Sequence, residues 1–222
     1  MMKNEIIIRI ISSVAILPLV SFFIIKGSFF FLLFLILIFF IASYEWYMMS
    51  NKKKYQIPGY LFLICSFYSA YSLRNNFGDD KESLLIFIFI LTICILTDIG
   101  GYLFGKIFKG PKLTKLSPNK TYSGMIGGYS FSFLATYIII ENSDLFFNIS
   151  SIWSTKIFIF ILFISTVSQI GDIIVSYFKR LAKIKDTGKI IPGHGGILDR
   201  IDGIIFVFPF IFIMFKYDIL IL

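Results

Sequence analysis

Seven long apolar segments dominate this sequence and restrict the folds open to it. They cover, approximately, residues 8–25, 28–49, 58–73, 84–104, 122–140, 156–177 and 203–221. A helix of about 20 apolar residues crosses the roughly 30 Å hydrocarbon core of a bilayer. In lipid the backbone has to satisfy its own hydrogen bonds, so these segments form helices and not open strands. The pattern predicts an all-α fold, a polytopic integral membrane helix bundle with about seven transmembrane helices.

The composition supports a membrane protein. Hydrophobic residues make up 57% of the chain and charged residues 15%, whereas soluble domains are about a quarter charged. Lys3 and Arg9 precede the first apolar run as in a signal peptide, but Pro18 interrupts that run and no small-residue cleavage site follows. We therefore expect a retained first helix. The whole chain, residues 1–222, is expected to form one membrane-embedded domain.

The basic residues gather in alternate connections between the apolar segments. Short loops rich in Lys and Arg stay on the cytoplasmic side, while the intervening loops here carry acids such as Asp79 and Glu141. This segregation predicts a cytoplasmic N-terminus, with the basic loops at the cytoplasmic face of the plasma (inner) membrane. The basic connections hold Lys3 and Arg9; Lys52, Lys53 and Lys54; Lys106, Lys109, Lys112, Lys115 and Lys120; and Lys179, Arg180, Lys183, Lys185, Lys189 and Arg200.

Three carboxylates fall inside apolar segments, namely Glu45, Asp98 and Asp172. A charge at mid-membrane costs about 2.5–3.5 kcal/mol on insertion scales, so such residues usually face a cavity or a partner. All three are expected near the cytoplasmic ends of their helices. For Asp98 and Asp172, which lead into the richest basic loops, we favour a functional role. For Glu45, a function and simple pairing with a nearby lysine both remain open.

The stretch from Asp172 to Gly203 combines charges, glycines and acids. On a helix, Asp172, Ser176 and Lys179 share one face. Residues 192–196 read Pro-Gly-His-Gly-Gly, which favours close backbone approach. A new helix is expected near Ile197, with Asp199 and Asp202 together in its first turn.

Basic side chains, glycines and paired carboxylates indicate Mg²⁺-dependent phosphoryl or nucleotidyl transfer, because Mg²⁺ prefers oxygen ligands and substrate phosphates. A second segment, residues 105–128, has the same character. It offers Lys106, Ser117, Lys120 and Thr121 beside glycines. It contains no Walker A sequence, so a P-loop is excluded.

The segment SYFKRLAKIKDTGKIIPGHGGILDRID, residues 176–202, resembles the family signature of phosphatidate cytidylyltransferases. Further resemblance lies in TDIGGYLFGK (97–106), SPNKTYSG (117–124) and Glu45-Trp46. Two features depart from the family pattern. Val175 stands where members usually carry Glu, and the chain is short, through fewer helices between Lys54 and Asp98.

The resemblance implies that a phosphatidate oxygen attacks the α-phosphorus of CTP and releases pyrophosphate, which gives CDP-diacylglycerol. It implies CTP, phosphatidic acid and the bilayer as partners, Mg²⁺ as cofactor and no nucleic acid. A second, monovalent cation and a homodimer both stay open. The metal would be held by Asp98, Asp172, Asp199 and Asp202. Catalytic roles would fall to Asp172, Lys179, Arg180, Lys185, Asp186, His194 and Arg200. Substrate would contact Ser117, Lys120, Thr121, Ser176, Gly195 and Gly196.

For His194, acid or phosphate-donor chemistry and a purely loop-shaping role are equally compatible with the sequence. Several other functions compete with the main interpretation. A CDP-alcohol phosphotransferase would need a D-G-x-x-A-R run that is absent. A cytidylyltransferase or kinase acting on another lipid, a cation-coupled transporter using Asp98 and Asp172, and an inactive relative lacking the Glu at position 175 remain alternatives. A transporter would place its acids near the membrane midplane within repeated broken helices.

Overall fold

The computed structural model describes residues 2–114, 117, 120–142, 155–191, 193, 195–217 and 219, with backbone only for 2–11, 13 and 140–142. Within these residues the chain is helical and forms no strand, only two isolated bridges. The helices are α1 (Met2–Lys26), α2 (Ser28–Ser50), α3 (Gln56–Asn75), α4 (Asp80–Phe108), α5 (Tyr122–Asn142), α6 (Thr155–Leu181), α7 (Leu198–Ile201) and α8 (Ile204–Lys216). The all-α prediction is confirmed.

Each predicted apolar segment corresponds to one helix. Three of them, α2, α4 and α6, are long and apolar enough to cross a membrane by length and composition. Two shorter apolar stretches lie in α1, at Val14–Lys26, and in α8. The last helix is shorter than expected, because it ends at Lys216 and not near residue 221. The chain therefore has the apolar helices of a membrane protein.

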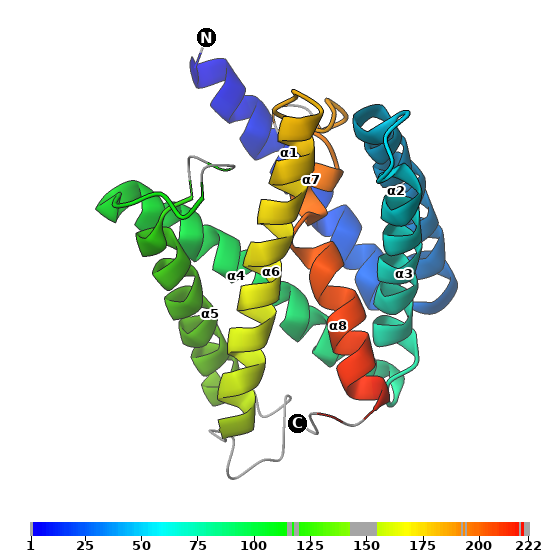
Figure 1. Ribbon diagram of the computed structural model, residues 1–222. Coiled ribbons are helices and arrows are strands. Elements are labelled where there is room, and N and C mark those ends of the chain that lie inside the picture. The colour runs from blue at the N-terminus through cyan, green and yellow to red at the C-terminus, as the bar shows by residue number, and fades with distance from the viewer. Residues whose placement is uncertain are drawn as a thin grey trace.

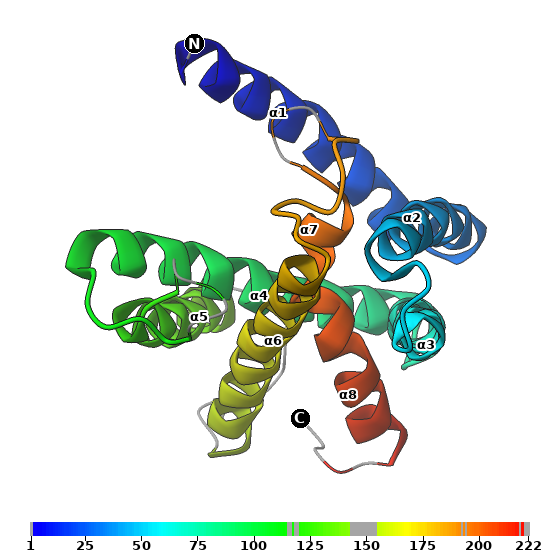
Figure 2. The ribbon, with the colours of Figure 1, turned by 45° about the horizontal axis from the view of Figure 1, so that its top comes forward.

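The helices run back and forth between two ends of the molecule (Figure 1). The α2–α3 connection and the segment from α6 to α7 lie at the upper end of the view, where α1 also begins, and α4 reaches that side at its C-terminal end. The α3–α4 connection lies at the lower end. With the upper end turned forward, α2 and α3 lie on one side of α7, α5 lies along α4 on the other side, and α4 runs behind α6 and α7 toward α3 (Figure 2). The described basic connections thus gather at one end.

Glycines bring α4 and α5 into close contact. A Cβ atom on Gly100 would lie 2.4 Å from the carbonyl oxygen of Gly127, and one on Gly127 would lie 2.3 Å from the Cβ of Phe104. Small residues at such a crossing let two backbones approach in a membrane, where packing replaces the hydrophobic driving force. This crossing sets the position of the connection between α4 and α5, which carries Ser117, Lys120 and Thr121.

A buried arginine at the lower end ties three helices together. Arg74, fully buried in α3, donates from Nε to the carbonyl of Ile24 at 2.7 Å and from Nη2 to that of Ile25 at 3.1 Å. Its Nη1 pairs with Asp80 at 2.7 Å. These carbonyls belong to the last turn of α1, which has no helical donors for them. Arg74 therefore caps α1 and joins it to α3 and α4.

Candidate active site

An ion pair between Lys120 and Asp172 joins the two basic segments. Lys120 belongs to the connection before α5, where its N–H donates to the Ser117 carbonyl at 3.0 Å. Its ammonium group pairs with the Asp172 carboxylate of α6 and lies 3.4 Å from the carbonyl of Gln169. Ser176, one turn after Asp172, points its hydroxyl at the same carboxylate, at 3.4 Å. The predicted meeting of the two segments is found at these residues.

Asp202 lies against the same part of α6. A Cβ on Gly171 would be 3.0 Å from the carbonyl oxygen of Asp202, and a Cβ on Gly203 would be 2.5 Å from the Ser168 hydroxyl. These small residues let the chain after α7 approach α6 closely. Asp202 is buried at 8% exposed. Burial, together with the neighbouring carboxylates of Asp172 and Asp98, raises its pKa well above the usual range. Three acids therefore gather here. The charges of Lys179 and Lys120 oppose this effect and act to lower the Asp202 pKa.

Asp199 has a different environment, although only three residues separate it from Asp202. Its Oδ1 accepts a hydrogen bond from Lys179 at 2.8 Å, and its Oδ2 accepts from the N–H groups of Thr187 at 2.8 Å and Gly196 at 3.0 Å. Burial acts to raise the Asp199 pKa, but the Lys179 ammonium and the two N–H groups outweigh it and lower that pKa. Both of its carboxylate oxygens are therefore bound to groups of α6 and of the α6–α7 segment.

Glu45 contacts the same segment from α2. Its Oε1 accepts from the N–H of Ile197 at 2.9 Å, and its Oε2 accepts from the N–H of Leu198 at 2.8 Å and the hydroxyl of Thr187 at 2.7 Å. At 1% exposed it is one of the most deeply buried charged groups described. Of the two alternatives left open for Glu45, the contacts of the described residues do not show pairing with a lysine, because backbone N–H groups and a hydroxyl bind both carboxylate oxygens. No pattern in the sequence singled out Thr187.

The remaining predicted site residues lie on or beside these segments. Thr121 accepts from the N–H of Gly124 at 3.1 Å and caps the start of α5. Arg180 is exposed and donates to the carbonyl of Ile184 at 3.1 Å. Gly195 adopts a left-handed φ of 87° beside the side chains of Asp199 and Asp186. Lys185, Asp186 and Arg200 are exposed. His194 lies outside the described residues.

The donor atoms available here suit a hard divalent cation only in part. Asp98, Asp172 and Asp202 offer carboxylate oxygens, the donor type that Mg²⁺ prefers. Within the described part of the chain, however, no group of three or more Asp, Glu, His or Cys side chains is arranged to enclose a metal ion. Mg²⁺ commonly binds through one or two carboxylates and takes its other ligands from water and phosphate. Such an open arrangement fits these residues.

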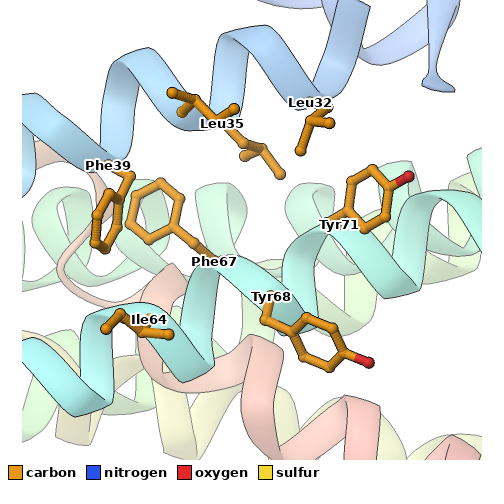
Figure 3. Close-up of a pocket in the computed structure, with 8 residues that line it drawn as sticks. Leu32, Leu35, Phe39, Ile64, Phe67, Tyr68 and Tyr71 are labelled. Atoms are coloured by element: carbon orange, nitrogen blue, oxygen red, sulfur yellow. The ribbon is translucent and has the colours of Figure 1, made fainter. Parts of the chain in front are cut away.

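The structure also contains two apolar cavities. One of about 270 Å³ separates α2 from α3, and Figure 3 shows Leu32, Leu35 and Phe39 facing Phe67 and Tyr71 across it. No charged side chain lines it, so phosphate chemistry does not belong there. Another, of about 200 Å³, is lined by apolar and aromatic side chains that include Val175, Trp46 and Leu198. Val175 is therefore part of an apolar cluster, which fits the absence of an acid at that position.

The fold is an all-helical bundle with the apolar helices of a membrane protein, and acidic and basic side chains gather at one end of it. These features place the chain in the class of helical membrane proteins with a polar site at one end. Sequence comparison is more specific. Residues 7–77 and 59–218 match the model of the Cytidylyltransferase family, and the chain belongs to this family. The two matched ranges overlap at residues 59–77.

The relatives include proteins named phosphatidate cytidylyltransferase from several bacteria. The one from Rickettsia conorii is 35% identical over 96% of this chain and 92% of its own length. The one from Staphylococcus saprophyticus is 35% identical over 76% of this chain, and the one from Brucella suis is 36% identical over 62%. The chain spans 64% of the staphylococcal protein and 49% of the Brucella protein.

Proposed function

We propose that this protein transfers a cytidylyl group from CTP to phosphatidic acid, which yields CDP-diacylglycerol and pyrophosphate for phospholipid synthesis. Family membership and the name shared by its relatives support the proposal. The observation that carries it is the Lys120–Asp172 ion pair. This contact brings the two segments that resemble the family pattern to one location, beside Asp202.

The reaction needs positioning and charge compensation more than a protein nucleophile. A phosphate oxygen of phosphatidic acid forms a bond to the α-phosphorus of CTP, and the bond from that phosphorus to the bridging oxygen breaks as pyrophosphate leaves. Two unit charges 4 Å apart repel by about 1 kcal/mol in water but about 4 kcal/mol at an effective dielectric of 20. Lys120, Lys179 and Arg200 would offset this repulsion between the anionic reactants.

A divalent cation, Mg²⁺, is proposed as the cofactor. Asp98, Asp172 and Asp202 would hold it, because their carboxylates lie close enough to influence one another and offer the oxygen donors that Mg²⁺ prefers. When bound, the ion would neutralise charge on the phosphates. Asp199, engaged with Lys179, would hold the phosphate-binding segment in shape from beside that ion.

We also propose that the bundle crosses the plasma membrane seven times, with the N-terminus and the site at the cytoplasmic face. The described basic connections lie at one end of the molecule, as the alternation of Lys and Arg along the sequence requires. CTP would then reach the site from the cytoplasm, and phosphatidic acid would reach it from the inner leaflet.

The decisive assay supplies purified protein in mixed micelles with CTP labelled at the α-phosphorus. We expect label in CDP-diacylglycerol when phosphatidic acid and Mg²⁺ are both present, and none when either is omitted. Label found in another lipid, or no labelled lipid from a folded preparation, would contradict the proposal. Offering a polyprenyl phosphate in parallel separates this activity from a related transfer to another lipid.

A further inference from the structure

Glu45 joins α2 to the segment that carries the proposed site, across most of the length of the chain. Its three partners, Thr187, Ile197 and Leu198, lie on the two sides of the loop between α6 and α7. The N–H groups of Ile197 and Leu198 stand at the start of α7, where a helix has no internal acceptors for them. Glu45 therefore supplies the acceptors that this segment lacks.

Thr187 connects Glu45 to Asp199. A hydroxyl carries one proton, and its oxygen lies 2.7 Å from Glu45 and 3.1 Å from Asp199, so it donates to Glu45. The Thr187 N–H donates to Asp199 at 2.8 Å. Asp199 in turn binds the Lys179 ammonium. A continuous hydrogen-bonded chain thus runs from α2 through the loop to α6.

Two glycines make room for the Glu45 carboxylate. A Cβ on Gly196 would lie 2.6 Å from both carboxylate oxygens, and one on Gly188 would lie 2.7 Å from Oε1. Real Cβ atoms do not approach that closely, so a side chain at either position would displace Glu45. These glycines therefore serve an internal carboxylate, a use distinct from approach to a substrate phosphate.

We propose that Glu45 is a positioning residue for the proposed cytidylyl transfer: through Thr187, Ile197 and Leu198 it fixes the segment that presents Asp199 and Asp202. The inference rests on the proposed function for its catalytic consequence. Its structural part, that Glu45 holds the loop, stands independently. A misplacement of about 1 Å at a catalytic group can cost about 100-fold in rate, so a firm anchor outside the loop has a large effect.

The first test replaces Glu45 by Gln, which keeps the shape but turns one acceptor into a donor facing an N–H or hydroxyl. We expect kcat per folded molecule to fall about 30- to 100-fold, with the thermal unfolding midpoint in detergent close to that of the unchanged protein. Glu82→Gln is the matched control. Glu82 lies in the capping box of α4, and its variant should keep full activity.

A second pair isolates the hydroxyl. Thr187→Val removes the donor to Glu45 with little change in shape, whereas Thr187→Ser keeps it. We expect Thr187→Val to lower kcat about 10-fold, the scale of one lost buried hydrogen bond, and Thr187→Ser to retain most activity. Equal activity of the two variants would contradict the inference, even if Glu45→Gln failed to fold.

Rescue tests the geometry. Gly188→Ala should lower kcat by displacing the Glu45 carboxylate, and Glu45→Asp, with its shorter side chain, should relieve that clash. The double variant is therefore expected to be more active than the product of the two single losses predicts, because residues in contact are not additive. Strict additivity would overturn the inference.

Hydrogen exchange separates this inference from the proposed function. In Glu45→Gln the amides of residues 187–198 should exchange faster, while those of α4 and α5 should not change. This measurement needs no substrate, so it decides whether Glu45 holds the loop even if the unchanged protein forms no CDP-lipid. Unaltered exchange over residues 187–198 would overturn the inference whatever the activity.

Discussion

The ammonium group of Lys120 forms an ion pair with the carboxylate of Asp172, which links the connection before α5 to the middle of the site on α6. Both side chains are partly buried, at 23% and 29% exposed. Lys120 also acts on the charges of Asp98 and Asp202. One lysine therefore acts on three acids, which come from α4, from α6 and from the turn between α7 and α8.

Removing this lysine charge should impair catalysis strongly. In Lys120→Met, Asp172 loses its ion-pair partner, and the proposed CTP phosphates lose a partner. We expect kcat/KM for CTP to fall about 100-fold, the scale of one lost electrostatic contact in an active site. Lys112→Met, on the same connection and exposed, serves as the control and should lose less than about threefold. Similar losses in both variants would mean that Lys120 has no specific role.

Asp202 and Asp199 should respond differently to the same change. Asp202→Asn removes a proposed cation ligand, so turnover should fall and the Mg²⁺ concentration for half-maximal activity should rise about 10-fold or more. Asp199→Asn breaks the Lys179 ion pair, so turnover should fall with little change in that Mg²⁺ concentration. Titrating Mg²⁺ against both variants measures this difference. A large rise for Asp199→Asn would restore Asp199 to the set of metal ligands.

The crossing of α4 and α5 predicts unequal effects of two adjacent glycine substitutions. Gly100→Ala would place a Cβ 2.4 Å from the Gly127 carbonyl, whereas Gly101→Ala meets its nearest atom, the Gly124 carbonyl oxygen, at 3.6 Å. Overpacking of this kind costs about 1–3 kcal/mol. We expect the unfolding midpoint in detergent to drop by several degrees for Gly100→Ala only. Comparable midpoints for the two variants would disprove the close packing.

Arg74 should matter for stability and not for catalysis. Arg74→Met leaves the Ile24 and Ile25 carbonyls without donors inside the bundle, at about 1.5–3 kcal/mol for each hydrogen bond to a charged group. Asp80 is 74% exposed, so Asp80→Asn should cost less than about 1 kcal/mol. Denaturant or thermal unfolding gives both values. A fall in kcat for folded Arg74→Met would contradict its assignment to the opposite end of the bundle.

Much of the fold follows from the sequence because lipid leaves an apolar segment few alternatives to a helix. The positions of the helices were therefore predicted well, while their ends were not. The last helix ends at Lys216, and α7 has only four residues. The beginning of α7 near residue 197 was anticipated from the glycines before it.

The candidate site was predicted only in part. The meeting of Lys120 with Asp172 follows from two basic segments lying on one side of the bundle. The separate environments of Asp199 and Asp202 do not follow from a three-residue spacing, because each partner is set by chain that is distant in sequence. The same reason hides the contacts of Glu45 with Ile197 and Leu198. Gly127, one of the glycines of the 105–128 segment expected to suit phosphate approach, packs α5 against α4 instead.

The account depends on both basic segments lying at the cytoplasmic face, where they build one site. Lys112 and Lys189 are exposed on the two segments, so single substitutions to Cys can be labelled with a membrane-impermeant maleimide, with the unchanged chain as background. We predict that both positions label in inside-out vesicles and neither labels in intact cells. Labelling of the two positions from opposite sides of the membrane would contradict the account.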